Sequence, residues 1–304
     1  MGRLASRRVA GRSVPYLLVV PVAAVIGAIL GYPMYSLVRL SLQKYDLFAL
    51  IAHHGTYVGL HNFGSVLHDS IFWHTLLRTV VFTAANVGLT MVLGTLIALL
   101  LVRISTWVRL LVTAGLVLVW AMPPVVAVQV WSWMTNSENG VLNYLLAQLH
   151  LGNFFQHDWY ATPFWQLTMV TTLIVWEALP FVAITLYAAL SQVPHELVEA
   201  AEIDGARSWR VFKDVTMPVI TPVLLILTSL SILWDFGVFT QPFLLIGAGH
   251  IVPGNYLMGI YVYEKGYAET NFGLGAAISL LMLVIVAAMS VVYVRRMLRV
   301  GEVE

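Results

Sequence analysis

The stretch 197-LVEAAEIDGARSWRVFKDVTMPVITP-222 holds a tight cluster of charged side chains, and it lies between two long apolar runs. Charge is scarce elsewhere, because only 10% of the 304 residues are charged while 60% are hydrophobic, and the mean hydropathy is +0.84. An average soluble domain carries about a quarter charged residues, so this chain cannot cover a water-facing surface. The composition therefore predicts an all-α integral membrane protein in which this segment stays outside the lipid.

Six apolar runs are long enough to cross a membrane, since a spanning helix needs about 20 mainly apolar residues. They are Val14–Leu40, Leu76–Val102, Leu110–Trp133, Leu167–Leu190, Val219–Ile246 and Phe272–Val294. The charged stretch connects the fourth run to the fifth. We expect a six-helix membrane domain over residues 14–304, preceded by a tail of residues 1–13.

The basic residues predict how these helices are oriented. Four arginines precede the first run, two lie between the second and third, three basic residues lie between the fourth and fifth, and three arginines follow the sixth. The loop of residues 135–166 has no Lys or Arg. The positive-inside rule then places both termini and the charged stretch in the cytoplasm. The first run is too long for a signal peptide and lacks a cleavage site, so we expect it to be retained.

The charged stretch has the pattern of a short helix followed by a turn. Pro194 suits a first helical turn, and Gly205 supplies the left-handed conformation that ends a helix. A second short helix is expected at Ser208–Asp214, and Pro218 and Pro222 mark the start of the fifth run. Spacing of i, i+3, i+4 and i+7 gives the first helix one common face, which carries Leu197, Ala200, Ala201 and Asp204.

Two interpretations of this segment are open, a docking element for a cytoplasmic partner and an amphipathic loop on lipid headgroups. Helices that bind anionic lipid are normally rich in Lys and Arg. Here five acidic residues stand against three basic ones in the segment 196–214. The charge balance favours docking, and the small alanines allow another surface to approach closely.

The segment resembles the EAA loop of ABC importer permeases. The matching positions are Glu199, Ala200, Ala201, Asp204, Gly205, Ala206, Phe212, Met217 and Pro218. Four further stretches are similar to the carbohydrate-uptake branch, in the first of two paired permeases (the maltose-F or glycerol-3-phosphate-A type). They are YVGLHNF at 57–63, FWHTLLRTVVFT at 72–83, ENGVLNYLL at 138–146 and FGLGAAISLLML at 272–283.

This resemblance implies a type I ABC importer permease fold in a bacterial or archaeal plasma membrane, with a coupling loop at about 191–218. It implies a second permease subunit as heterodimer partner, a cytoplasmic ATP-binding subunit dimer, and an extracytoplasmic solute-binding protein. The chain lacks a Gly-x-x-x-x-Gly-Lys-Ser/Thr loop, so ATP and magnesium would bind the partner ATPase, and we expect no cofactor here. The chain is then a transport subunit and not an enzyme, with no nucleic acid partner, and membrane lipid around it.

Ionisable and polar groups at membrane depth are candidates for a substrate path, because they are costly there. The candidates are Asp235, Gln241, Trp131, Gln129 and Glu177. Hydroxyl hydrogen bonding and aromatic stacking suit a carbohydrate, most simply a di- or oligosaccharide. The alternative, that Glu177 and Asp235 only join helices, stays open. Four prolines are expected to break helices near such a site: Pro123, Pro124, Pro180 and Pro242.

Other functions have weaker support in the sequence. A proton-coupled secondary transporter would use Glu177 and Asp235 as a relay, yet it has no need of a docking loop. A membrane enzyme would need a convergent set of catalytic residues, and no spacing supports one. The histidines of the outer loops lack a helical pair with a nearby carboxylate, and the chain has no cysteine, so no metal site is predicted.

Overall fold

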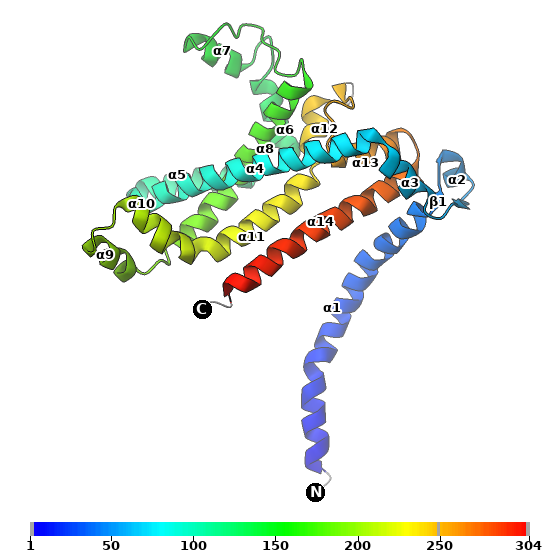
Figure 1. Cartoon of the computed structure of the whole chain (residues 1–304), viewed down its shortest axis with the longest axis horizontal. Coiled ribbons are helices and arrows are strands. Elements are labelled where there is room, and N and C mark those ends of the chain that lie inside the picture. Colours follow the sequence, from blue (N-terminus) through cyan, green and yellow to red (C-terminus); the bar gives the residue numbers. More distant parts are fainter. Residues whose placement is uncertain (1–2, 248–249, 302–304) are drawn as a thin grey trace. The chain divides into compact units, whose positions relative to one another are not determined.

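The computed structural model describes residues 3–247 and 250–301, and it is built almost entirely of helices (Figure 1). Two short strands, β1 (Gln43–Lys44) and β2 (Thr56–Tyr57), form an antiparallel pair. The α-helices are α1 (Arg3–Ser41), α2 (Leu47–Ile51), α3 (His61–His68), α4 (Ser70–Arg103), α5 (Thr106–Trp120), α6 (Pro124–Met134), α7 (Val141–Gln148), α8 (Pro163–Leu190), α9 (His195–Ile203), α10 (Ser208–Val211), α11 (Met217–Phe236), α12 (Thr240–Ile246), α13 (Met258–Tyr263) and α14 (Phe272–Gly301). Two π-helical turns are η1 (Phe212–Thr216) and η3 (Glu264–Ala268).

The chain divides into two compact units, and the first comprises residues 1–69 and 262–283. It contains the β1–β2 pair, and Asn62 of α3 donates from Nδ2 to the carbonyl oxygens of Ser41 (2.8 Å), before β1, and Gln43 (2.9 Å), within it. The start of α14 reaches the same place, because Asp46 and Asn271 form an antiparallel bridge. A β-carbon on Gly273 would collide with the carbonyl oxygen of Gln43, so only glycine permits this approach.

The second unit comprises residues 70–261 and 284–304 and holds the main helical bundle. Helices α4, α8 and α11 lie side by side, and α5 runs along α8 (Figure 1). The contact between α4 and α8 is close, since a β-carbon on Gly94 would lie 2.6 Å from Cγ1 of Val182. A buried apolar cluster joins the three helices: Ala98, Val182, Leu186, Ala189, Leu190, Ile220 and Leu227.

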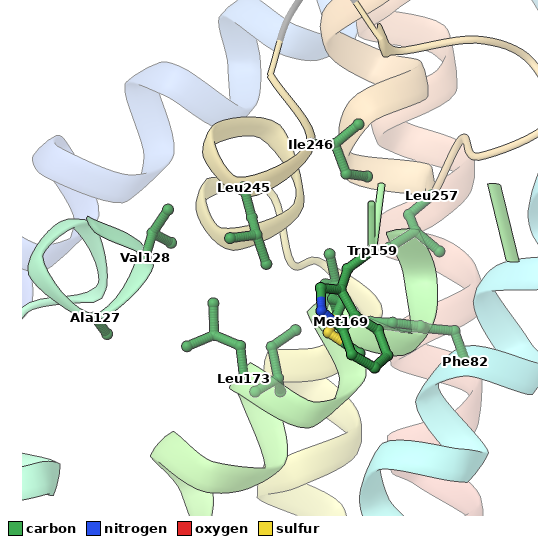
Figure 2. Packing of buried hydrophobic residues seen from close by; sticks show 11 residues of the cluster. Phe82, Ala127, Val128, Trp159, Met169, Leu173, Leu245, Ile246 and Leu257 are labelled. Carbon is green, nitrogen blue, oxygen red and sulfur yellow. The ribbon is translucent and has the colours of Figure 1, made fainter. Parts of the chain in front are cut away.

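A second apolar cluster lies where α6, α8 and α12 meet the loop that follows α7. Figure 2 shows Trp159 of that loop beside Met169 of α8, with Leu245 of α12 and Val128 of α6 directed into the same cluster. Hydrogen bonds between polar side chains lie beside this cluster. Trp159 donates from Nε1 to Oδ1 of Asn143 (2.6 Å), and Asn255 donates to Oε1 of Gln166 (2.6 Å).

Five helical segments are long and apolar enough to cross a membrane. They are Val19–Ser41, Ser70–Arg103, Pro163–Leu190, Ser208–Phe236 and Phe272–Tyr293. The third predicted span is broken, because α5 and α6 meet at an angle of 102°, and only as one bent pair do they supply a sixth. The predicted helical fold is thus confirmed, with five or six candidate spans, and the break falls at the predicted position, Pro123–Pro124.

Three expectations about the helices are wrong in detail. The fifth apolar run is not one helix, since α11 ends at Phe236 and α12 begins at Thr240, although this break lies just before Pro242, where one was expected. Pro180 does not break α8, which continues through it with the proline buried against neighbouring helices. Ser208–Asp214 is not a separate helix, because α10, η1 and α11 follow one another without a gap. The wide π turn lies just before Pro218, whose missing N–H disturbs the regular ladder.

Candidate functional site

The loop between α8 and α11 has the local structure that its residues predict. Pro194 is the N-cap of α9, and Gly205 follows the helix with φ of +79°. The backbone N–H of Ala206 donates to the carbonyl of Ala201 (3.0 Å), which closes the turn. A positive φ strongly favours glycine, so the direction of the chain after α9 depends on Gly205.

Several of the predicted docking residues lie on an exposed side of this loop. Glu199, Ala200 and Asp204 are exposed, while Ala201 and Ala206 are half-buried. Within the described residues, no acidic side chain of α9 takes part in an ion pair. The face offers small and acidic groups to another surface.

The far end of the loop is more firmly held by the bundle. Phe212 is half-buried and its ring lies 5.8 Å from that of Trp209. Val211 beside it is buried. Pro218 is exposed in the first turn of α11. The loop therefore has a free helix at one end and an anchored one at the other.

Three of the five candidate substrate-path residues come together where α6, α8 and α12 meet. Gln241 of α12 donates from Nε2 to Oε2 of Glu177 on α8, at 3.0 Å. Trp131 of α6 meets Trp176, the neighbour of Glu177, edge to face with ring centroids 6.0 Å apart. Helices α6, α8 and α12 thus share a polar and aromatic junction beside the breaks that follow α5 and α11.

Asp235 and Gln129 lie outside this junction. Gln129 is exposed on α6, and neither residue makes a side-chain hydrogen bond to the pair among the described residues. Asp235 is only 7% exposed and lies in the last turn of α11. A carboxyl group there is removed from water, which is costly for a polar side chain without a compensating hydrogen bond.

Three aromatic residues not singled out from the sequence form a row across neighbouring helices. The rings of Trp120 and Phe181 stack with centroids 6.2 Å apart, and Phe181 lies 5.7 Å from Trp234. The two tryptophans, on α5 and α11, are each 57% exposed. No signal along one helix could have found this row, because each ring comes from a different one.

Two arginines near the ends of helices serve as connectors. Arg109 donates to the hydroxyl of Tyr187 (2.7 Å) and to the carbonyl of Ile104 (3.0 Å), and its guanidinium lies 5.5 Å from the Tyr187 ring centroid. Arg78 donates to the carbonyls of Pro253 (3.0 Å) and Tyr256 (2.9 Å). Arg109 thus joins α5 to α8, and Arg78 joins α4 to the loop before α13.

The loop of residues 135–162 also contains a buried phenol. Burial raises the pKa of Tyr160, whose hydroxyl lies 2.7 Å from Oγ1 of Thr135. The phenol therefore keeps its proton at neutral pH and acts as a hydrogen-bonding group of the loop. In the part of the chain that the structure describes, no three His, Asp or Glu side chains gather closely enough to hold a metal ion.

Comparison with known proteins adds three findings. The model of the family described as "Binding-protein-dependent transport system inner membrane component" matches residues 90–299. The diacetylchitobiose uptake system permease protein DasB of Streptomyces coelicolor is 40% identical, over 99% of this chain and 91% of that protein. The trehalose/maltose transport system permease protein MalF of Thermococcus litoralis is 30% identical, over 92% of each.

Solved structures share the same fold. A bacterial ABC transporter involved in the import of the acidic polysaccharide alginate has a chain that superposes with a TM-score of 0.80. The match covers 97% of this chain and 98% of that one, at 17% sequence identity. At that identity the likeness concerns the arrangement of the helices.

Proposed function

This chain belongs to the binding-protein-dependent transport system inner membrane component family, and we propose that it is the carbohydrate permease subunit of an ABC importer. The chain is a transport component of the plasma membrane rather than an enzyme, as its family describes. The observation that carries the proposal is its 40% identity, over 99% of its length, to a diacetylchitobiose permease.

The substrate class follows from the relatives and from the side chains at membrane depth. Diacetylchitobiose, trehalose and maltose, in the names of two relatives, are all disaccharides. Sugars bind through hydroxyl hydrogen bonds and through ring faces against aromatics. The Glu177–Gln241 pair and the Trp120–Phe181–Trp234 row offer both kinds of contact. A di- or oligosaccharide therefore suits the chain better than glycerol-3-phosphate, since Arg78 is bound to backbone carbonyls.

The proposed path passes Asp235, Gln241, Trp131, Gln129 and Glu177. Asp235 is the strongest candidate because it is buried at a helix end and, among the described residues, makes no side-chain hydrogen bond that offsets its burial. Ionisable groups held under such conditions at membrane depth are functional candidates. Glu177 and Gln241 hold α8 and α12 together, and the same pair offers polar atoms to a sugar.

ATPase coupling is assigned to the loop of residues 191–218, with Glu199, Ala200, Ala201, Asp204, Gly205, Ala206, Phe212 and Pro218. The exposed face of α9 supports this assignment. In this topology six spans lie within residues 14–304, and the tail of residues 1–13 and both termini are cytoplasmic. A second permease completes the pore, a solute-binding protein delivers the sugar, and ATP with magnesium binds the ATPase subunits.

Two measurements test the proposal. Purification of the tagged chain should bring down a second permease and a nucleotide-binding subunit, and cells should take up a disaccharide without sensitivity to uncouplers. Uptake that needs a proton gradient and proceeds without any ATPase would identify a secondary transporter instead.

Asp235→Ala and Asp235→Asn test the path itself, with Glu138→Gln in the exposed outer loop as a matched removal of charge. Both Asp235 variants should lose uptake while the ATPase still copurifies, and the control should transport normally. Unchanged uptake by both Asp235 variants would remove this residue from the path.

A further inference from the structure

A groove lies between the bundle and the inner side of α9, and of the residues assigned to ATPase coupling only Phe212 lines it. Its volume is about 860 Å³, within the range of ligand-binding pockets. Its walls come from α4, the end of α8, α9, α10, η1 and α11, all within the second unit. The side chains that form most of the walls are apolar and include Leu96, Leu99, Val198, Trp209, Phe212 and Leu224.

We propose that this groove binds one phospholipid of the cytoplasmic leaflet, with a zwitterionic headgroup that carries an ammonium. The side of the membrane rests on the orientation proposed above. The bound lipid would fill the space between α9 and the bundle.

The length of the groove matches one leaflet. Its α4 wall runs from Met91 to Arg103, which at 1.5 Å per residue is about 18 Å. Half of a bilayer's hydrocarbon core is about 15 Å. The wall is apolar except at two positions. Thr95 satisfies its hydroxyl on the carbonyl of Met91 (2.7 Å), and Arg103 ends the helix.

The charged groups of the groove fit the headgroup. Arg103 and Glu202 both line it, one at the end of α4 and one on α9. Both are exposed, and within the described residues neither forms an ion pair. Arg103 would bind the phosphodiester, and Glu202 would bind the ammonium of a phosphatidylethanolamine. A purely anionic lipid would meet Glu202 with like charge.

The groove and the docking face use different sides of one helix. His195, Val198 and Glu202 of α9 line the groove, at spacings of three and four residues. Ala200 does not line it and is exposed. A lipid on the inner side would therefore support α9 without obstructing the opposite face.

The test uses the complete transporter, purified with its partner subunits and exchanged into equal parts of phosphatidylethanolamine and phosphatidylglycerol. Native mass spectrometry counts the retained lipids. Leu96→Trp fills the groove, and Leu100→Trp is its control, because Leu100 is similarly exposed on the same helix but does not line the groove. Arg103→Gln removes the phosphate contact, and Arg207→Gln removes a charge from the loop outside the groove.

Leu96→Trp should abolish one retained phosphatidylethanolamine, and Arg103→Gln should weaken its retention about two- to fivefold, the effect of one exposed ion pair. Glu202→Gln should reduce the preference for phosphatidylethanolamine over phosphatidylglycerol. Both controls should match the wild type.

Two outcomes would overturn the inference. One is equal lipid retention by the wild type, Leu96→Trp and Arg103→Gln. The other is loss of the second permease from Leu96→Trp, since the groove would then be a subunit interface. Because ATPase copurification is scored in the same samples, failure of lipid binding is separable from failure of the transport proposal.

Discussion

The α9 loop and the junction of α6, α8 and α12 both keep polar residues in an apolar chain, but they do so in opposite ways. The loop exposes its acidic groups and takes its shape from local signals such as Pro194 and Gly205. The junction joins Glu177 and Gln241, which are 64 residues apart, across two helices. The acidic groups of the loop are therefore available to a partner, whereas the polar groups of the junction already join two helices of the bundle.

The largest effect is expected in the loop, from Gly205→Val. Its φ of +79° is strained for any β-branched residue, at a cost of about 1–2 kcal/mol, and the turn that positions α9 should be lost. Uptake and ATPase copurification should both fall severely. Gly205→Asn is the control, because asparagine tolerates this conformation and no atom lies within 4 Å of a β-carbon there. A valine variant that keeps its ATPase would show that the loop does not depend on this turn.

The junction should respond differently to Glu177→Leu. The change leaves the Gln241 amide without its acceptor, at a cost of about 1–3 kcal/mol, and should lower uptake while ATPase copurification persists. Glu177→Gln keeps an acceptor oxygen and should have a smaller effect on uptake. Loss of ATPase copurification from Glu177→Leu would show that the junction and the loop do not differ in this way.

These two regions also differ in how far their sequence predicts them. The apolar runs, the break at Pro123–Pro124 and the α9 turn follow from composition and local chemistry. The gap between α11 and α12 lies just before Pro242, where a helix break was expected, since a proline disturbs the turn that precedes it. Its exact bounds were not predicted, because Gly237–Phe239 contains no proline and continues an apolar run. At Pro180 a break was predicted but is absent, since a buried proline is accommodated when neighbouring helices surround it.

Contacts between helices stay hidden from a single sequence for the same reason. The aromatic row of Trp120, Phe181 and Trp234 takes one ring from each of three helices, so it has no spacing to recognise. The Glu177–Gln241 pair was foreseen only as two separate candidates. Residue type indicated which groups are unusual, but packing decides which of them meet.

A smaller effect on transport, seen mainly as a loss of stability, is expected at the contact between α4 and α8, from Gly94→Ala. The new methyl group would lie 2.6 Å from Cγ1 of Val182, and overpacking of this kind costs about 1–3 kcal/mol. The melting temperature of the purified complex should fall. Adding Val182→Ala makes room, so the double variant should melt above Gly94→Ala alone. If the second change lowers the melting temperature further, the two helices are less tightly packed than described.

The smallest effect is expected from Tyr187→Phe. It removes the 2.7 Å hydrogen bond from Arg109 but keeps the ring beneath the guanidinium, so about 1 kcal/mol should be lost. Arg109→Lys also loses the fork to the Ile104 carbonyl and should cost more. Thermal unfolding of the two variants measures the difference. Equal melting temperatures for both variants and the wild type would show that this link between α5 and α8 carries no stability.

The bend between α5 and α6 has a mechanical consequence. At 102° the two axes are nearly perpendicular, so a displacement along α5 reaches α6 almost entirely broadside. Arg109 joins α5 to the end of α8 from which the α9 loop departs. Trp131 on α6 lies beside Trp176. A small displacement of α5 along its axis would thus move α6 sideways at the junction of α6, α8 and α12.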